Sequence, residues 1–173
     1  KNYFWMVPYD LQGLIDSIGG KEAAEKRLDE MFRRLDASYG DEWFASGNEP
    51  SFQIPWIYNW AGAPYKAQQV IRRILNEQYS SRVNGLPGND DLGSMGAWYV
   101  LASIGLFPEI PGVGGFSVNS PVFRKIVLHL PEGDVIIKGG DEKKEYIHSL
   151  SLDGKKMDGT WIDWSDLYRG ATL

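Results

Sequence analysis

The stretch GNDDLGSMGAWYV, residues 88–100, sets two adjacent carboxylates between glycines at the start of a helix rich in aromatic residues. Carboxylates at a helix N-terminus are stabilised by free backbone N–H groups and by the positive end of the helix dipole. Asp90 and Asp91 can therefore be simple helix caps. The same pair is also what a sugar-cleaving enzyme or a metal site requires, so both interpretations are open at this point.

Helical patterns extend from this stretch back towards the N-terminal end of the chain. Apolar residues recur with helical spacing, and start or stop signals such as Asp10, Gly19 and Pro64 bound the segments. Five helices are expected, beginning near Leu11, Lys21, Pro50, Pro64 and Leu92, and the last of them ends at Ile104. The third is apolar nearly all round, so we expect it to be buried, with a kink at Pro55. In the fourth, Arg72 is expected to face outward.

Polar-faced and apolar-faced helices alternate, which favours a layered α/α arrangement in which outer helices cover inner ones. In such a layer each outer helix returns the chain, so consecutive inner helices start at the same end. Two polar clusters lie at the starts of inner helices, Asn48-Glu49-Pro50 and Asn89-Asp90-Asp91. The pattern therefore predicts that both clusters face one pit.

The composition changes after Pro108, where a loop is expected over residues 111–115. Short β-branched or alternating runs follow at residues 125–130, 134–138 and 146–152, and Asp153-Gly154 is a hairpin signal. These runs predict a small antiparallel sheet. The expected fold class is α+β, with helical hairpin layers in residues 1–110 followed by a β-rich segment in residues 111–173.

The composition excludes several functions. A chain of 173 residues with 43% hydrophobic residues can fill a core, and its net charge of −5 with dispersed basic residues argues against a nucleic-acid partner. It has no cysteine for disulfides or thiolate metal sites. No run approaches the roughly 18 apolar residues of a membrane span.

The acid and base groups of the helical part are carboxylates, because the two histidines lie in the strand-like runs. Asn, Asp and Glu oxygens suit a hard cation such as calcium, and a carboxylate that binds no metal could act as a general base. Aromatic residues nearby offer flat faces for sugar rings, although each can equally serve the core. They are Trp5, Trp43, Trp56, Tyr58, Trp60, Trp98 and Tyr99.

Three strings carry a family resemblance: YFWMVPYDLQGLIDSIGG (3–20), GNEPSFQIPWIYNWAGAPYKAQQVIRRI (47–74) and GNDDLGSMGAWYVLASIGLFPEIPG (88–112). They resemble the C-terminal catalytic region of the bacterial glycoside hydrolase family 92 α-mannosidases. The tail, SPVFRKIVLHL (120–130) and YIHSLSLDGK (146–155), is similar to the segment that follows it.

The resemblance implies an exo-acting, calcium-dependent, inverting α-mannosidase that removes terminal mannose from glycans. It implies that the helices form part of an (α/α)6 barrel, which in the family packs on a β-sandwich. Asp91 matches the family's general base, with Asp90 as a less favoured neighbour, and Asn48 and Glu49 match its calcium-binding element. Substrate contacts are expected from Ser46, Gly47, Asn89 and Trp98.

Departures from the family pattern narrow these expectations. Asn89 stands where other members carry a second base candidate, Asp, and an amide cannot act as a base. Members specific for α1,2 linkages tend to carry His-Glu where this chain has Ser46-Gly47, which argues against that linkage. Tyr9 replaces a frequent His.

The family's general-acid Glu lies upstream of the motif at residues 3–10, and five helices cannot close a twelve-helix barrel. We therefore expect a C-terminal part of a larger enzyme, cut at Lys1 and inactive alone, whose partners are a mannose-containing glycan and the remainder of the parent polypeptide. The family's role implies a periplasmic, secreted or cell-surface location. Two alternatives stay open: a non-catalytic sugar-binding module and a structural piece of an inactive homologue.

Overall fold

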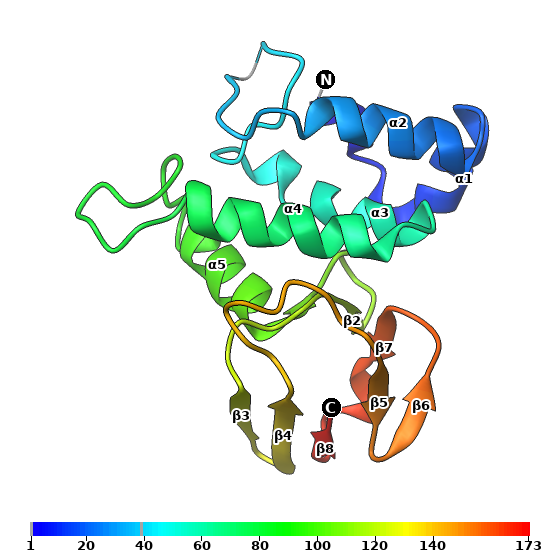
Figure 1. Cartoon of the computed structure of the whole chain (residues 1–173), viewed down its shortest axis with the longest axis vertical. Coiled ribbons are helices and arrows are strands. Elements are labelled where there is room, and N and C mark those ends of the chain that lie inside the picture. Colours follow the sequence, from blue (N-terminus) through cyan, green and yellow to red (C-terminus); the bar gives the residue numbers. More distant parts are fainter. Residues whose placement is uncertain (1, 39) are drawn as a thin grey trace. The chain divides into compact units, whose positions relative to one another are not determined.

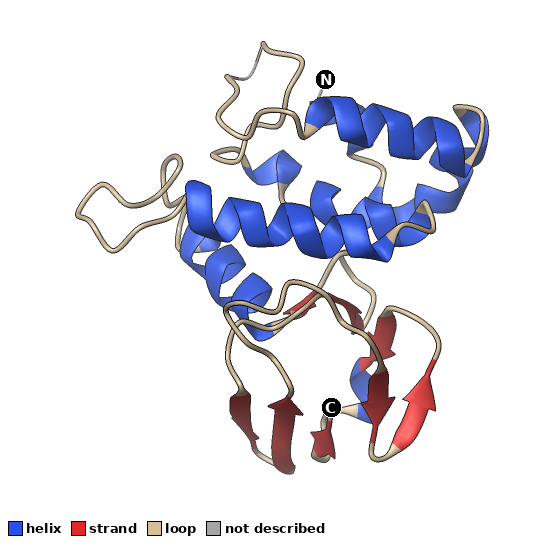
Figure 2. Ribbon diagram, viewed as in Figure 1, coloured by secondary structure: helices blue, strands red, loops and turns tan. Residues whose placement is uncertain are grey.

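The computed structural model describes residues 2–38 and 40–173, so the expected cut at Lys1 lies outside the described residues (Figure 1). The chain divides into two compact units, one ending at Val100 and the other beginning at Leu101. The first is built from helices and the second mainly from strands (Figure 2). This mixed content confirms the α+β class.

The helices of the first unit begin close to the predicted positions. They are α1 (Leu11–Ser17), α2 (Lys21–Met31), α3 (Ile57–Trp60), α4 (Pro64–Glu77) and α5 (Ser94–Ile104), with short 3-10 turns η1 (Asn2–Trp5), η2 (Pro8–Asp10), η3 (Glu49–Ser51) and η4 (Ile54–Trp56). Asp10 caps α1 as expected, because its carboxylate accepts a hydrogen bond of 3.0 Å from the N–H of Gly13. α3 contacts both α2 and α4 (Figure 1).

The helix expected to begin at Pro50 is broken into three pieces, η3, η4 and α3. Pro55 is the second residue of η4 and has no N–H to donate, which favours a break in the helix rather than the expected kink. The expected burial is confirmed, because Ile54, Trp56 and Ile57 have no exposed surface.

The outward orientation predicted for Arg72 is wrong. Only 6% of Arg72 is exposed, so this charged residue of α4 is buried like the apolar residues Ile71, Ile74 and Leu75 of the same helix. Its long apolar stem makes such burial possible once the guanidinium has partners.

The division between the two units falls within α5, after residue 100. The boundary that the sequence pattern places after residue 110, between a barrel portion and a β-rich segment, stays a prediction. The C-terminal end of α5 is hydrogen-bonded to residues 119–122. Asn119 donates from its side chain to the carbonyl of Ala102 over 2.9 Å, and the N–H of Val122 donates to the carbonyl of Ser103 over 3.0 Å.

The second unit holds three small sheets rather than the single antiparallel sheet that was expected. The strands are β1 (Leu106–Phe107), β2 (Gly115–Val118), β3 (Lys125–Leu130), β4 (Gly133–Lys138), β5 (Leu150–Leu152), β6 (Lys155–Met157), β7 (Trp161–Asp163) and β8 (Ala171–Thr172). They pair in the orders β1-β2-β7, β3-β4-β8 and β5-β6, and β8 runs parallel to β4.

Two of the predicted strands, β3 and β4, pair over their full length, from Lys125 with Lys138 to Leu130 with Gly133. Of the run predicted at residues 146–152, only β5 is a strand. The hairpin signal is confirmed, because Asp153 and Gly154 have φ of 49° and 78° and connect β5 to β6. A core cluster that includes Val135, Ile162 and Leu167 fills this unit.

Candidate active site

The two polar clusters predicted to share a pit follow two loops whose backbones touch. A Cβ built on Gly47 would lie 2.5 Å from the carbonyl oxygen of Pro87, and one built on Gly88 would lie 2.5 Å from the carbonyl oxygen of Gly47. Such approaches leave no room for a side chain at either position. The glycine contact therefore holds the start of Asn48-Glu49 beside the start of Asn89-Asp90-Asp91. That the two clusters face one pit stays a prediction.

A left-handed turn precedes α5. Asp91, Leu92 and Gly93 have φ of 49°, 60° and 90°, and the first two are not glycines. The sequence predicted a helix from Leu92, but left-handed residues cannot continue a right-handed helix, so α5 begins at Ser94. Non-glycine residues in this region are costly and gather at functional sites.

The two neighbouring aspartates have different surroundings. Asp90 caps α5, because its Oδ1 accepts from the N–H of Gly96 over 3.2 Å and its carbonyl accepts from the N–H of Met95 over 3.1 Å. Asp91 is exposed, and its carboxylate makes no hydrogen bond or ion pair with the residues that the structure describes. The cap interpretation thus holds for Asp90, while the Asp91 carboxylate is open to a ligand or to water.

Ser94 connects the two polar clusters. Its Oγ lies 2.6 Å from the carbonyl oxygen of Asp91 and 3.3 Å from Oε1 of Glu49. The hydroxyl has one hydrogen and donates to one of these oxygens at a time. Glu49, at the start of η3, is exposed, and the contact with Ser94 brings it near the left-handed turn. Its second carboxylate oxygen makes no hydrogen bond or ion pair with a described residue.

The oxygen atoms of Asn48 and Glu49 are of the type that a hard cation binds. Asn48 is 9% exposed, and its Nδ2 is buried without a hydrogen-bond partner among the described residues. Asn48 and Glu49 supply amide and carboxylate oxygens, the ligands that calcium prefers. Calcium takes 6–8 oxygens, and the described ranges contain no group of three or more His, Cys, Asp or Glu side chains that could hold a metal. Most ligands would therefore be carbonyl oxygens, water or groups from outside the described residues.

The expected substrate contacts differ in exposure. Asn89 is exposed, whereas Ser46 is 6% exposed and its hydroxyl lies 3.0 Å from Oε1 of Gln78. Trp98 is 3% exposed, donates from Nε1 to the carbonyl of Phe52 over 3.0 Å, and stacks on the ring of Tyr79 at 5.7 Å between centroids. A sugar contact by Trp98 stays a prediction.

The core takes up other aromatic residues that the sequence offered as sugar platforms. Trp5, Trp56 and Tyr58 are each no more than 3% exposed, whereas 42% of Tyr99 is exposed. The alternative of core packing therefore holds for the first three.

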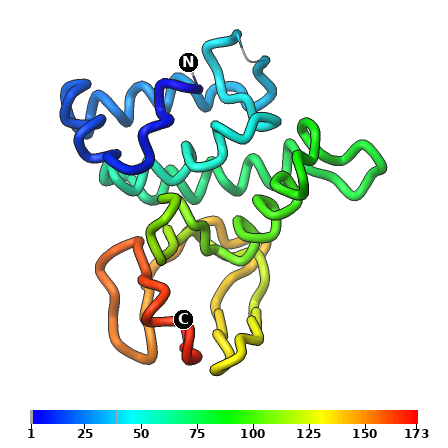
Figure 3. Tube along the Cα trace, turned by 180° about the vertical axis from the view of Figure 1, so that it is seen from behind, coloured from blue at the N-terminus to red at the C-terminus, as the bar shows by residue number. Residues whose placement is uncertain are grey.

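Sequence reasoning missed three residues around the site, Gln78, Tyr79 and Ser94. Gln78 and Tyr79 follow the end of α4 and lie outside both polar clusters in the sequence, and Figure 3 shows the long green loop between them and α5. Burial, and secondarily the negative charge of Asp90, raises the pKa of the Tyr79 hydroxyl, so this group stays protonated. Ser94, three residues after Asp91, was the one that local spacing could have identified.

An exposed carboxylate beside a second acidic cluster is the kind of site that carboxylate-based glycosidases use. A model of the glycosyl hydrolase family 92 catalytic domain matches residues 1–173. The chain belongs to this family.

Three relatives illustrate the match. An uncharacterized secreted glycosidase from Arthroderma benhamiae is 31% identical over 179 residues, covering 100% of this chain and 22% of the relative. The family GH92 α-mannosidase BT3965 from Bacteroides thetaiotaomicron has 34% identity and a TM-score of 0.89, over 99% of this chain and 23% of that protein. The family GH92 inverting mannosidase BT2199 from the same organism has 28% identity and a TM-score of 0.86, over 99% of this chain and 26% of that protein.

The chain thus spans about a quarter of the length of these relatives. The relatives include a fungal and a bacterial protein, so the bacterial character of the resemblance stays a prediction. In the part of the chain that the structure describes, no helix has the length and apolar character needed to cross a membrane.

Proposed function

We propose that this chain is part of an exo-acting, inverting α-mannosidase and that it supplies the general base, Asp91. The observation that carries the proposal is the contrast between the two aspartates. Asp90 is occupied in capping α5, whereas Asp91 is exposed in a left-handed turn with a carboxylate that no described residue engages. The mannosidases among the structural neighbours, one of them also solved with mannoimidazole, support the choice of sugar.

Inversion needs two carboxyl groups on opposite faces of the sugar ring. The Asp91 carboxylate takes the proton from a water molecule as that water attacks the anomeric carbon. A carboxylic acid on the other face donates a proton to the leaving oxygen, and we place this acid in the remainder of a longer polypeptide, which also completes an (α/α)6 barrel around residues 1–110. Asn89 holds no proton-accepting group, so it can only bind or orient.

The metal proposal concerns Asn48 and Glu49. These residues would hold a calcium ion, which supplies Lewis-acid and template chemistry at the sugar hydroxyls when bound. The buried, unpartnered amide of Asn48 supports this role, because flipping an amide exchanges its nitrogen and its oxygen. The secreted relative supports a place of action outside the cytoplasm, either periplasmic, secreted or at the cell surface.

The first test replaces Asp91 by Asn in the full-length protein. We expect kcat for an α-mannoside to fall by about 10²- to 10⁴-fold, the usual contribution of a general base, with an unchanged melting temperature. Asp90→Asn is the matched control, because Asn caps helices as well as Asp does and most activity should persist. Near wild-type turnover by Asp91→Asn would remove Asp91 from the base role, and glycan binding without hydrolysis by the wild type would favour a binding module.

The second test concerns the metal. Removal of calcium with a chelator should lower activity, and restored calcium should bring it back. Calorimetric titration of the chelated protein with calcium should give a weaker affinity for Glu49→Ala than for the wild type, since one ligand is lost. Glu77→Ala, at an exposed position on α4, is the control. Equal calcium affinities in all three proteins would exclude Glu49 as a ligand.

A further inference from the structure

Ser94, the first residue of α5, has a hydroxyl that lies among three oxygen acceptors. Its Oγ is 2.6 Å from the carbonyl oxygen of Asp91, 3.2 Å from that of Asp90 and 3.3 Å from Oε1 of Glu49. The first two acceptors belong to the polar cluster before α5, and the third belongs to the cluster at η3, 45 positions before Ser94. Ser94 thus contacts both polar clusters of the candidate active site.

Both hydrogen bonds that hold Asp91 come from Ser94. The carbonyl of Asp91 accepts from the Ser94 N–H over 3.2 Å and from the Ser94 hydroxyl over 2.6 Å, and Asp91 makes no further hydrogen bond with a residue that the structure describes. Asp90 is also held by the N–H groups of Met95 and Gly96. The position of the proposed base therefore depends on Ser94.

The turn at Asp91 needs this restraint because its backbone is in an unfavourable conformation. Asp91 and Leu92 have φ of 49° and 60° although neither is a glycine. Residues of this kind are strained and persist where the surrounding contacts fix them. The free energy of one hydrogen bond is comparable with this strain, so loss of the Ser94 hydroxyl should loosen the turn.

Glu49 competes with Asp91 for the Ser94 hydroxyl. The hydroxyl has one hydrogen, so it donates to one acceptor at a time. The Asp91 carbonyl is nearer, at 2.6 Å, but the Glu49 carboxylate at 3.3 Å is charged. Hydrogen bonds to charged acceptors are about twice as strong as those between neutral groups. Neutralising the charge of Glu49 therefore favours the hydrogen bond to Asp91.

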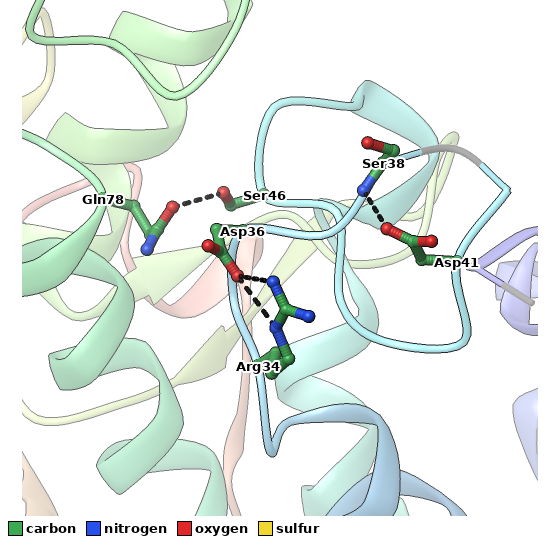
Figure 4. A network of polar contacts seen from close by, with 6 residues as sticks. All are labelled: Arg34, Asp36, Ser38, Asp41, Ser46 and Gln78. Carbon is green, nitrogen blue, oxygen red and sulfur yellow. Dashed lines mark hydrogen bonds and ion pairs between the residues drawn. The ribbon is translucent and has the colours of Figure 1, made fainter.

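Ser46, in the loop before Glu49, does not make the same connection (Figure 4). Its hydroxyl lies 3.0 Å from Oε1 of Gln78, the residue after α4. Among the described residues, Ser46 makes no hydrogen bond with Asp91 or with the Glu49 side chain. The side-chain contact between the two clusters is therefore that of Ser94.

We infer that Ser94 is a positioning residue for the base and that it connects the state of Glu49 to the order of the turn at Asp91. The inference rests on the proposed function of Asp91 as the general base. Ser94 touches no reacting atom in this role, because its hydroxyl restrains the backbone from which the Asp91 carboxylate projects. A Glu49 carboxylate that binds a cation is a weaker acceptor, so the turn is firmest when the proposed cation site is filled.

The first measurement is the steady-state kinetics of the full-length protein with 4-nitrophenyl α-mannoside. Ser94→Ala should lower kcat by about 3- to 10-fold with little change in KM, because a hydrogen bond that positions the base is lost while the sugar contacts remain. Ser94→Thr keeps a hydroxyl that can bond the same carbonyl, so it should restore most of kcat. Ser17→Ala is the matched control, because it removes a similar hydrogen bond of 2.7 Å, to the carbonyl of Leu14, at an exposed position.

The second measurement requires no activity. Hydrogen exchange at the backbone amide of residue 94, which donates to the Asp91 carbonyl, reports opening of the turn. In calcium-free protein, Glu49→Gln should slow this exchange by about 2- to 5-fold, because a neutral amide competes less well for the hydroxyl. In Ser94→Ala the exchange should be about 3- to 10-fold faster than in the wild type, and adding Glu49→Gln should then change nothing.

The outcomes separate the inference from the function on which it rests. Wild-type kcat and wild-type exchange in Ser94→Ala overturn the positioning role, and so does a fall in kcat that Ser94→Thr does not restore. An equal effect of Glu49→Gln with and without the Ser94 hydroxyl overturns the connection to Glu49.

If Ser94→Ala does not fold, the exchange of Glu49→Gln against that of the wild type decides, since both proteins keep Ser94. Equal exchange in these two proteins then overturns the inference. A wild type that cleaves no mannoside contradicts the proposed function itself, and the exchange data then decide whether Ser94 connects the two clusters.

Discussion

Gly88 is a residue at which one added methyl group should separate the two halves of the site. Its Cβ would lie 2.5 Å from the carbonyl oxygen of Gly47 and 2.9 Å from the Gly47 Cα, and backbone cannot swing aside as a flexible side chain does. Forcing atoms into a filled space costs about 1–3 kcal/mol. We therefore expect Gly88→Ala to lower both the melting temperature and the proposed mannosidase activity of the full-length protein.

Gly159→Ala is the matched control for this substitution, because nothing lies within 4 Å of a Cβ built there and its backbone is not left-handed. Thermal unfolding followed by circular dichroism and turnover of an aryl mannoside give the two readouts. An active Gly88→Ala variant with the wild-type melting temperature would mean that the two loops do not depend on this contact.

At the scale of secondary-structure elements, three helices share one polar cluster. Asp29 of α2 accepts from the Tyr58 hydroxyl of α3 over 2.9 Å and pairs with Lys66 of α4 over 2.6 Å, and Glu25 of α2 also pairs with Lys66 over 2.7 Å. Burial, followed by the hydrogen bond to Asp29, raises the pKa of Tyr58. Hydrogen bonds to Asp29 and Glu25 raise the pKa of Lys66.

These directions give a pH dependence with a definite sign. A raised pKa in the folded state means that the stabilisation is complete below the unfolded pKa, near 10 for Tyr and 10.5 for Lys, and is lost as the pH rises further. Tyr58→Phe should lower the melting temperature at pH 7, with a loss of about 1 kcal/mol. The difference from the wild type should stay constant up to about pH 9 and shrink above pH 10.

Tyr65→Phe on α4 serves as the control for this pH series, since 53% of Tyr65 is exposed. Melting temperatures of the three proteins between pH 6 and pH 11 decide the matter. A difference for Tyr58→Phe that widens above pH 10 would contradict the assignment.

Several elements were predictable because their signals are local. Asp10 caps α1, Gly20 precedes α2 and Pro64 begins α4, and each of these helices has an apolar stripe. β3 and β4 alternate in short runs that are close in sequence. The strands β1, β2, β7 and β8 have at most four residues, and each is stabilised by a partner elsewhere in the chain. Short runs of this kind carry no periodic signal, so their pairing could not be predicted from the sequence.

The whole molecule sets a limit on what this chain can do alone. It carries the proposed base but spans about a quarter of the length of its relatives. We expect the full-length protein to hydrolyse 4-nitrophenyl α-mannoside, and we expect the 173-residue chain, expressed by itself, to hydrolyse none under the same conditions. Circular dichroism of the isolated chain is the control for folding. Turnover by the folded, isolated chain would show that its own residues include the acid as well.

Candidate site residues could be predicted where the sequence signal is local, and not where the contact joins residues that are distant in the chain. Residue type and position were enough to select the two polar clusters that contain Glu49 and Asp91, and the family resemblance was needed to single out Asp91 as the base. The choice between Asp90 and Asp91 as an unoccupied carboxylate required the backbone, because only the fold shows which of them caps α5. Gln78 could not be selected, since it reaches Ser46 across 32 positions of the chain.

The left-handed turn at Asp91, Leu92 and Gly93 also limits how this protein can change over generations. Position 92 has a fully exposed side chain, and exposed positions usually accept many residue types. Here the backbone narrows the choice, because Val, Ile and Thr fit a left-handed conformation poorly whereas Gly, Asn and Asp fit it well. Neutral substitution beside Asp91 is therefore limited to a few residue types. When a library with all residue types at position 92 is selected for folded protein, we expect few of these types among the survivors.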